Sequence, residues 1–190
     1  MIAAKLPMSG SFAARIRYLF EGDGTDPDRV MFAEVQHLLS PPRDAAEEMA
    51  DTYRSRDRLK AAAGIRRGGR PCKRPVRHDV LSWADDERPS ATDMATAARS
   101  YLAALGLAPH EAVIVGHRHN GRHHVHIVSN VVNPLTGKVA DMTDDQPKAQ
   151  AWCADYERAE GRIRCRRRTA PKPAQALASA DGRRRSAQRL

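Results

Sequence analysis

Cysteine is scarce in this chain, which contains three among its 190 residues. Cys72, Cys153 and Cys165 lie far apart, and no two of them form a Cys-x-x-Cys pair. An odd number of widely spaced cysteines argues against a disulfide framework and against a zinc knuckle built from cysteines. The pattern fits a reducing compartment, and we expect a cytoplasmic protein.

Long apolar runs are also missing. No stretch approaches the roughly 20 apolar residues of a membrane-spanning helix, and we therefore expect no membrane span. The first ten residues, MIAAKLPMSG, lack the charged head and the long apolar stretch of a secretory signal. We expect a soluble protein that the general secretory route does not export.

Basic residues are in excess, with 32 Lys and Arg against 23 Asp and Glu and a formal net charge of +9. Each phosphate that a cationic side chain neutralises releases condensed counterions, which favours binding to a polyanion. Nucleic acid is the first expectation for the partner, and an anionic membrane surface is the second. The 41% of hydrophobic residues suffices for a core of one compact domain.

Hydrophobic periodicity, capping residues and turn signals divide the chain into strands and helices. The predicted strands cover residues 2–6, 30–35, 76–83, 112–119 and 123–132. The predicted helices are an amphipathic segment ending at Glu21-Gly22, residues 43–62, a segment from a Ser90–Asp93 capping box to Leu105, and a last helix opened by Pro147. This order predicts an α+β fold, a mostly antiparallel sheet flanked by helices with one late hairpin.

Two segments read as irregular and basic. Residues 64–75 are rich in Gly, Pro and Arg and predict a loop. Residues 169–190 combine Ala, Pro and Arg without hydrophobic periodicity, which predicts a disordered basic tail. We therefore expect one domain over residues 1–168 followed by that tail.

The late hairpin carries a histidine cluster. Side chains alternate faces along a strand, so His117 and His119 share a face, as do His124 and His126. A loop over residues 120–123 would place His119 opposite His124 and His117 opposite His126. Cross-strand Cβ atoms are ~5 Å apart, which lets imidazoles meet at one ion with metal-nitrogen distances of ~2.1 Å. The spacing predicts metal binding, with a structural zinc site and a catalytic site as the open alternatives.

His123 points to the other face by the same alternation and is not an expected ligand. Apolar residues fall on both faces of the hairpin strands, which predicts helices on one side and a filled site on the other. Asn130 shares the histidine face and has two open roles, holding a ligand in place or supporting the structure.

Three segments resemble the motifs of the relaxase and mobilisation nuclease family, the HUH endonucleases of broad-host-range plasmids and of T-DNA border cleavage. Residues 117–138, HRHNGRHHVHIVSNVVNPLTGK, resemble the third motif, whose histidines bind metal. Residues 1–24, MIAAKLPMSGSFAARIRYLFEGDG, resemble the first, which places the nucleophile at Tyr18. Residues 77–93, RHDVLSWADDERPSATD, resemble the second, whose serine near the scissile DNA is Ser82.

The resemblance covers roughly residues 1–168 and implies a conjugative relaxase, a metal-dependent enzyme that nicks and rejoins one DNA strand at a transfer origin. It implies a 5′-phosphotyrosine intermediate on Tyr18 and a divalent ion, Mg, Mn or Zn, on His117, His124 and His126. Helix geometry supports the tyrosine, because it lies roughly 200° from Ile16 and off the apolar face. We therefore expect Tyr18 to be exposed.

The implied partners are single-stranded and supercoiled DNA at a transfer origin, relaxosome accessory proteins and the coupling protein of a secretion system in a bacterial cytoplasm. Basic side chains near the tyrosine and in the predicted loop are expected to contact phosphates. With Ser82, the predicted DNA-binding residues are Arg15, Arg17, Arg66, Arg67, Arg70, Lys73 and Arg74.

One residue departs from the family pattern. Such relaxases usually have an aspartate two residues after the first histidine, and this chain has His119. His119 is a candidate catalytic base, a fourth ligand, or a sign of weakened activity. Two alternatives therefore stay open, a degenerate domain that binds metal and DNA without cutting, and a rolling-circle replication or transposition nuclease. The tyrosine ahead of the histidines disfavours the second of these.

Overall fold

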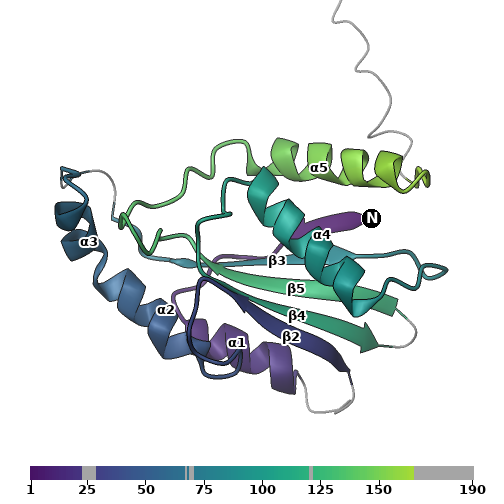
Figure 1. Cartoon of the computed structure of the whole chain (residues 1–190), viewed down its shortest axis with the longest axis horizontal. Coiled ribbons are helices and arrows are strands. Elements are labelled where there is room, and N and C mark those ends of the chain that lie inside the picture. The colour runs from purple at the N-terminus through teal and green to yellow at the C-terminus, as the bar shows by residue number, and fades with distance from the viewer. Residues whose placement is uncertain (23–28, 67, 69–70, 120–121, 165–190) are drawn as a thin grey trace, which may run out of the picture.

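The computed structural model describes residues 1–22, 29–66, 68, 71–119 and 122–164. Its strands form one five-stranded antiparallel sheet in the order β1-β3-β5-β4-β2 (Figure 1). The strands are β1 (Ile2–Lys5), β2 (Val30–Gln36), β3 (Val76–Ser82), β4 (Ala112–His119) and β5 (Arg122–Asn130). The helices are α1 (Phe12–Glu21), α2 (Ala45–Arg54), α3 (Arg56–Ala62), α4 (Ala91–Ala104) and α5 (Asp145–Ala159). The predicted α+β class with a mostly antiparallel sheet is confirmed.

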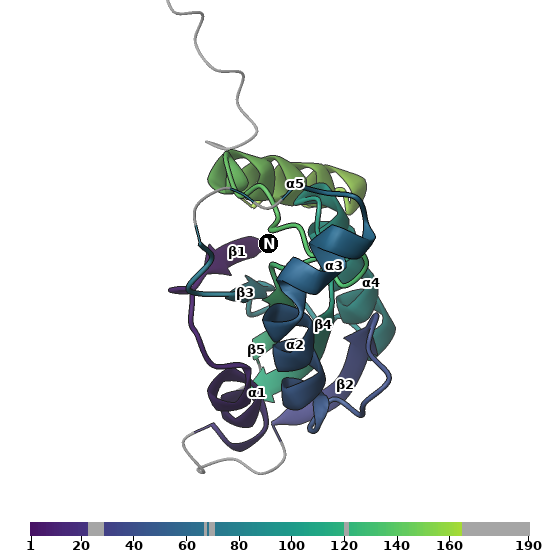
Figure 2. The same ribbon diagram turned by 90° about the vertical axis from the view of Figure 1, so that its left-hand side faces the viewer.

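Helices cover both faces of the sheet (Figures 1 and 2). On one face α1 and α2 pack over the strands, and the buried residues there include Phe12, Ile16, Leu19, Met49, Val113, Val115 and Val128. On the other face lie α4 and α5, and the buried residues include Leu81, Met94, Leu102, Ile114, Ile127 and Trp152. The prediction of helices on a single face was wrong. The histidines occupy one end of the α1 face, and helices cover the rest of it.

The prediction of one continuous helix over 43–62 was also wrong, because α2 and α3 are separate helices that meet at Ser55. Ser55 has ψ near 0°, well away from the helical value of about −42°, so the chain changes direction there. No Gly or Pro marks this break in the sequence. The capping box that opens α4 is confirmed, since Ser90 and Asp93 each bond the other's backbone N–H.

The central hairpin differs in register from the prediction. His117 pairs with His124, and His119 pairs with Arg122, whereas the predicted loop over 120–123 set His119 opposite His124. The error is a shift of two positions, and an even shift leaves every side chain on its predicted face.

A buried ionic network lies on the opposite face of the sheet from the histidines. The Arg77 guanidinium, 1% exposed, donates to Asp79 at 2.6 Å and also contacts Asp145 at the start of α5. Tyr101 donates to Asp79 at 3.2 Å, and Lys5 pairs with Asp145 at 3.0 Å. The network joins β1 and β3 to α4 and α5.

Among the described helices, none combines the length and apolar character that a membrane crossing needs.

Candidate metal centre and nucleophile

Three imidazoles from the central hairpin converge on one point. His117 comes from β4, and His124 and His126 come from β5. Each offers one possible ligand atom, and these atoms lie within 4.8 Å of one another. The ring centroids are 4.7 to 5.2 Å apart. Strand pairing, which sets His117 directly opposite His124, therefore builds the cluster without help from a loop.

The tautomer of His117 is fixed by α1. Its Nε2 lies 2.8 Å from the carbonyl oxygen of Leu19. A carbonyl can only accept a hydrogen bond, so Nε2 carries the proton and Nδ1 presents a lone pair. Burial, with smaller contributions from His124 and Arg29, lowers the pKa of His117 to about 4. The ring is therefore neutral at pH 7, which is the form that binds a metal.

His126 is also held neutral. Burial, and then the nearby His117 and His78, lower its pKa well below the usual 6.5. Neutral imidazoles are good ligands for divalent ions such as Zn and Ni, and three of them leave coordination positions for oxygen atoms of a substrate. The donor set of His117, His124 and His126 therefore fits a divalent ion.

Tyr18 lies beside this cluster on the last turn of α1, which runs next to β4 and β5 in Figure 2. Its side chain is 48% exposed, as predicted from the helix geometry. Its ring centroid is 6.3 Å from that of His126 and 6.4 Å from that of His78. Ile16 and Leu19 are buried under the same helix and fix its rotation, so the phenol faces the end of the sheet that carries the histidines.

Two residues near Tyr18 were missed by the sequence analysis. The first is Arg29, whose guanidinium donates to the carbonyls of Tyr18 at 2.5 Å and Leu19 at 2.8 Å. It also lies 5.9 Å from the centre of the Tyr18 ring. A Cβ on Gly22, which has φ of 58°, would come within 2.0 Å of this guanidinium. The glycine after the helix was a visible signal, but nothing in the sequence connected it to Arg29.

The second missed residue is His78 on β3. It is fully buried, and its Nε2 lies 2.9 Å from Nδ1 of His126. Burial, followed by the charge of Arg15, lowers the pKa of His78 to about 4. His78 and Ser82 share a strand face by alternation, so the signal was present in the segment that resembles the second motif.

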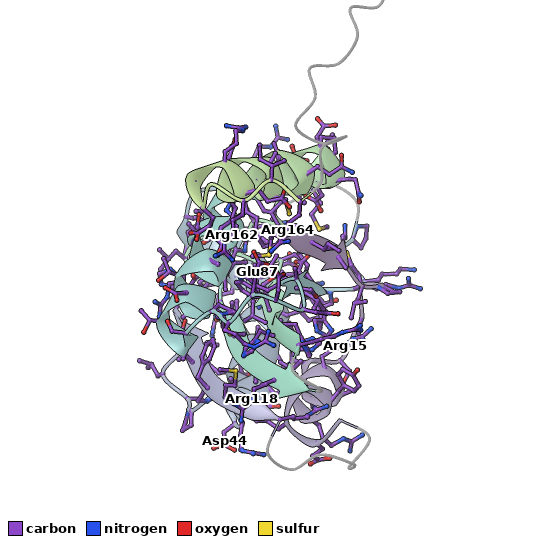
Figure 3. The ribbon with its side chains drawn as sticks, turned by 90° about the vertical axis from the view of Figure 1, so that its right-hand side faces the viewer. Arg15, Asp44, Glu87, Arg118, Arg162 and Arg164 are labelled. Carbon is purple, nitrogen blue, oxygen red and sulfur yellow. The ribbon has the colours of Figure 1, made fainter. Side chains whose placement is uncertain are left out.

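The predicted DNA-binding residues take several positions. Ser82 ends β3 directly opposite His124, close to the cluster. Arg15 extends from α1 toward the chain that follows β1, where it donates to the Pro7 carbonyl at 3.0 Å (Figure 3). Arg17 is exposed and lies 3.9 Å from Glu21. The remaining described residues of this set are all exposed: Arg66, Lys73 and Arg74.

Some predicted residues fall outside the described part of the chain. They are Arg67 and Arg70, the residues from 165 onward, and the side chain of His119. Asn130 is described, and its two open roles are resolved. It donates to the Met49 carbonyl at 3.0 Å and to Glu111 at 2.9 Å, so it ties α2 to the sheet and contacts no candidate ligand.

An antiparallel sheet whose central hairpin carries a histidine-hydrophobic-histidine triplet has the architecture of the HUH endonucleases. The chain belongs to the relaxase family, because residues 24–162 match the model of the MobA/VirD2-like relaxase nuclease domain. The matched range includes the three histidines, His78 and Ser82. It begins after Tyr18, so the place of the tyrosine rests on the geometry described above.

A curated relative supports the same family. The chain is 32% identical over 91 residues to "Protein MobA" of Acidithiobacillus ferrooxidans. The aligned region is 47% of this chain and 22% of that protein, so the chain spans a minor part of its relative.

Proposed function

We propose that this chain nicks and rejoins one DNA strand at a transfer origin in a metal-dependent reaction, with Tyr18 as the nucleophile. The observation that carries the proposal is the position of an exposed phenol beside three converging imidazoles. Family membership supports a DNA endonuclease acting in plasmid mobilisation. The reaction, its intermediate and its origin are our proposal.

The histidines and the tyrosine divide the chemistry. His117, His124 and His126 would hold a divalent ion, Mg, Mn or Zn. Such an ion supplies positive charge to the non-bridging oxygens of the scissile phosphate. The Tyr18 oxygen attacks the phosphorus and forms a phosphotyrosine bond to the 5′ end, while the bond to the 3′ oxygen breaks and that oxygen gains a proton. Because the ester is kept, a 3′ hydroxyl can later attack the phosphotyrosine and restore the strand.

The phenol must lose its proton as it attacks, since an ordinary tyrosine has a pKa of about 10. His119 is our candidate base, because it stands two residues after His117, where such relaxases usually have an aspartate. A fourth-ligand role for His119 is the alternative. Arg29 helps by position, because it binds the backbone of Tyr18 and places a positive charge 5.9 Å from the centre of its ring.

Positive side chains would guide the DNA strand toward Tyr18. Arg15 and Arg29 lie close enough to the histidines to affect their pKa values. Ser82 lies at the same end of the sheet. The outer part of the path would use further cations that neutralise phosphates without reading sequence: Arg17, Arg66, Arg67, Arg70, Lys73 and Arg74. We also propose that the chain acts in the cytoplasm, with relaxosome proteins and a secretion-system coupling protein as its partners.

A degenerate domain that binds without cutting is the second candidate, and His119 in place of the usual aspartate favours it. A nicking assay on supercoiled plasmid distinguishes the nicking enzyme from the degenerate domain. We expect the protein with Mn²⁺ to convert a plasmid carrying the cognate origin to the open circle, and to leave a plasmid without the origin intact. Added chelator should prevent the conversion. Binding of the protein to the plasmid without nicking under these conditions would support the degenerate domain.

A further inference from the structure

His78 is the residue of this site that the proposed reaction does not use. It sits on β3 opposite Val128, two residues along from the pair formed by Val80 and His126. Its ring centroid is 5.1 Å from that of His126, and its Nε2 faces Nδ1 of His126 at 2.9 Å. His78 is fully buried, on the sheet face over which α1 and α2 pack.

Two ring nitrogens at this separation share one proton, and only one arrangement suits metal binding. Nδ1 of His126 is hydrogen-bonded to His78, so Nε2 is the nitrogen that His126 can offer to an ion. A neutral imidazole with a lone pair on Nε2 carries its proton on Nδ1. Nδ1 of His126 must then donate, and Nε2 of His78 must accept.

The second nitrogen of His78 gives an independent observation. Nδ1 of His78 is buried and has no hydrogen-bond partner among the described residues. A buried polar atom without a partner is costly, and native proteins keep few of them. A phenylalanine would fill the same space without this cost. The histidine is therefore explained by what its Nε2 does for His126.

We infer that His78 is a positioning residue of the metal centre, which accepts a hydrogen bond from Nδ1 of His126 and holds that ring with Nε2 toward a divalent ion. The inference rests on the metal centre of the proposed function. The Leu19 carbonyl does the same for His117. Partners of this kind fix the tautomer and orientation of a ligand, and losing one typically weakens metal binding 10- to 100-fold.

Titration with Co²⁺ alone, followed by its visible absorption, tests the inference without DNA or cleavage. His78→Phe keeps a ring but removes the acceptor, and it should weaken Co²⁺ binding by about 10- to 100-fold. His78→Gln places an amide oxygen near the position of Nε2 and should restore most of the affinity. His123→Phe is the matched control, because His123 is also a buried histidine of the sheet but faces away from the cluster. It should bind Co²⁺ as the wild type does.

Equal affinity of the His78→Phe and His123→Phe variants, or equal weakening by Phe and Gln at position 78, would overturn the inference. Should His78→Phe fail to fold, nitrogen-15 NMR of the Zn²⁺-loaded wild type decides. The inference requires the proton of His126 on Nδ1, and a proton on Nε2 would contradict it. Both measurements can be made on the Tyr18→Phe variant, so a failure of the proposed cleavage would leave their outcome intact. A wild-type chain that binds no Co²⁺ would refute the metal centre and this inference together.

Discussion

The ring of Tyr18 stands edge-on to the imidazole of His126, with 6.3 Å between centroids and 83° between planes. One residue comes from the end of α1 and the other from the central strand of the sheet. Packing of Ile16 and Leu19 against the strands holds the two elements together. The position of Tyr18 beside His126 is therefore set by the folded core. A phosphate bound to an ion on the histidines would lie within reach of the phenol.

Replacing both His124 and His126 with Ala should abolish binding of a divalent ion and leave the chain folded. The hairpin is paired along its length with β2 and β3, so its position does not depend on these two rings. Elemental analysis of the purified variant and its circular dichroism spectrum check the two halves of this expectation. Undiminished metal content would show that His124 and His126 do not hold the ion.

Arg29→Met should destabilise the protein modestly and slow attack by Tyr18. It removes a cation from the carbonyls at the end of α1, where such a charge contributes roughly 0.3–2 kcal/mol. Arg17→Met is the control, because Arg17 is 72% exposed and its pairing with Glu21 is loose. Urea denaturation should change at position 29 and not at 17, and cleavage at saturating DNA, where a loss of phosphate contacts at Arg17 no longer limits the rate, should slow only at position 29. Equal behaviour of the two variants would mean that Arg29 holds nothing in place.

Arg77→Met should be strongly destabilising. It leaves Asp79 and Asp145 buried without their cation, and breaking a buried pair from one side typically costs about 3–5 kcal/mol. Arg54→Met removes an exposed arginine that pairs with Glu47 and Asp51, and it should leave the unfolding transition almost unchanged. Thermal unfolding compares the two. A small effect at position 77 would show that the network is not what joins α5 to the sheet.

Deleting residues 169–190 should weaken binding to cognate and unrelated DNA by a similar factor. The segment is rich in arginine, and phosphate contacts of this kind carry no sequence information. The slope of affinity against salt concentration should become shallower for both DNAs. If the truncated chain loses affinity for cognate DNA alone, the tail reads sequence.

The sequence predicted the site as far as local periodicity reaches. Alternation along a strand placed His117, His124 and His126 on one face, and helix geometry predicted that Tyr18 is exposed. The hairpin register was wrong by two residues, yet the even shift left those faces unchanged.

Alternation along the strand places His78 on the face of Ser82, but the roles of His78 and Arg29 could not be predicted in this way. The role of His78 depends on β3 lying beside β5, which is a long-range pairing that periodicity does not determine. The role of Arg29 depends on the chain returning to the end of α1 after residues that carry no pattern. The break at Ser55 likewise has no Gly or Pro to announce it.

Covalent attack by Tyr18 would leave a protein–DNA adduct, which can be measured on single-stranded cognate DNA with Mn²⁺ or Mg²⁺. Wild-type protein should give an adduct that resists denaturant, is destroyed by protease and is joined through the 5′ phosphate. Tyr18→Phe removes one oxygen from an exposed side chain, so it should change stability by less than about 0.5 kcal/mol and preserve DNA binding. Tyr18→Phe should form no adduct. An adduct that persists in this variant, or the absence of one from the wild type, would refute covalent attack by Tyr18.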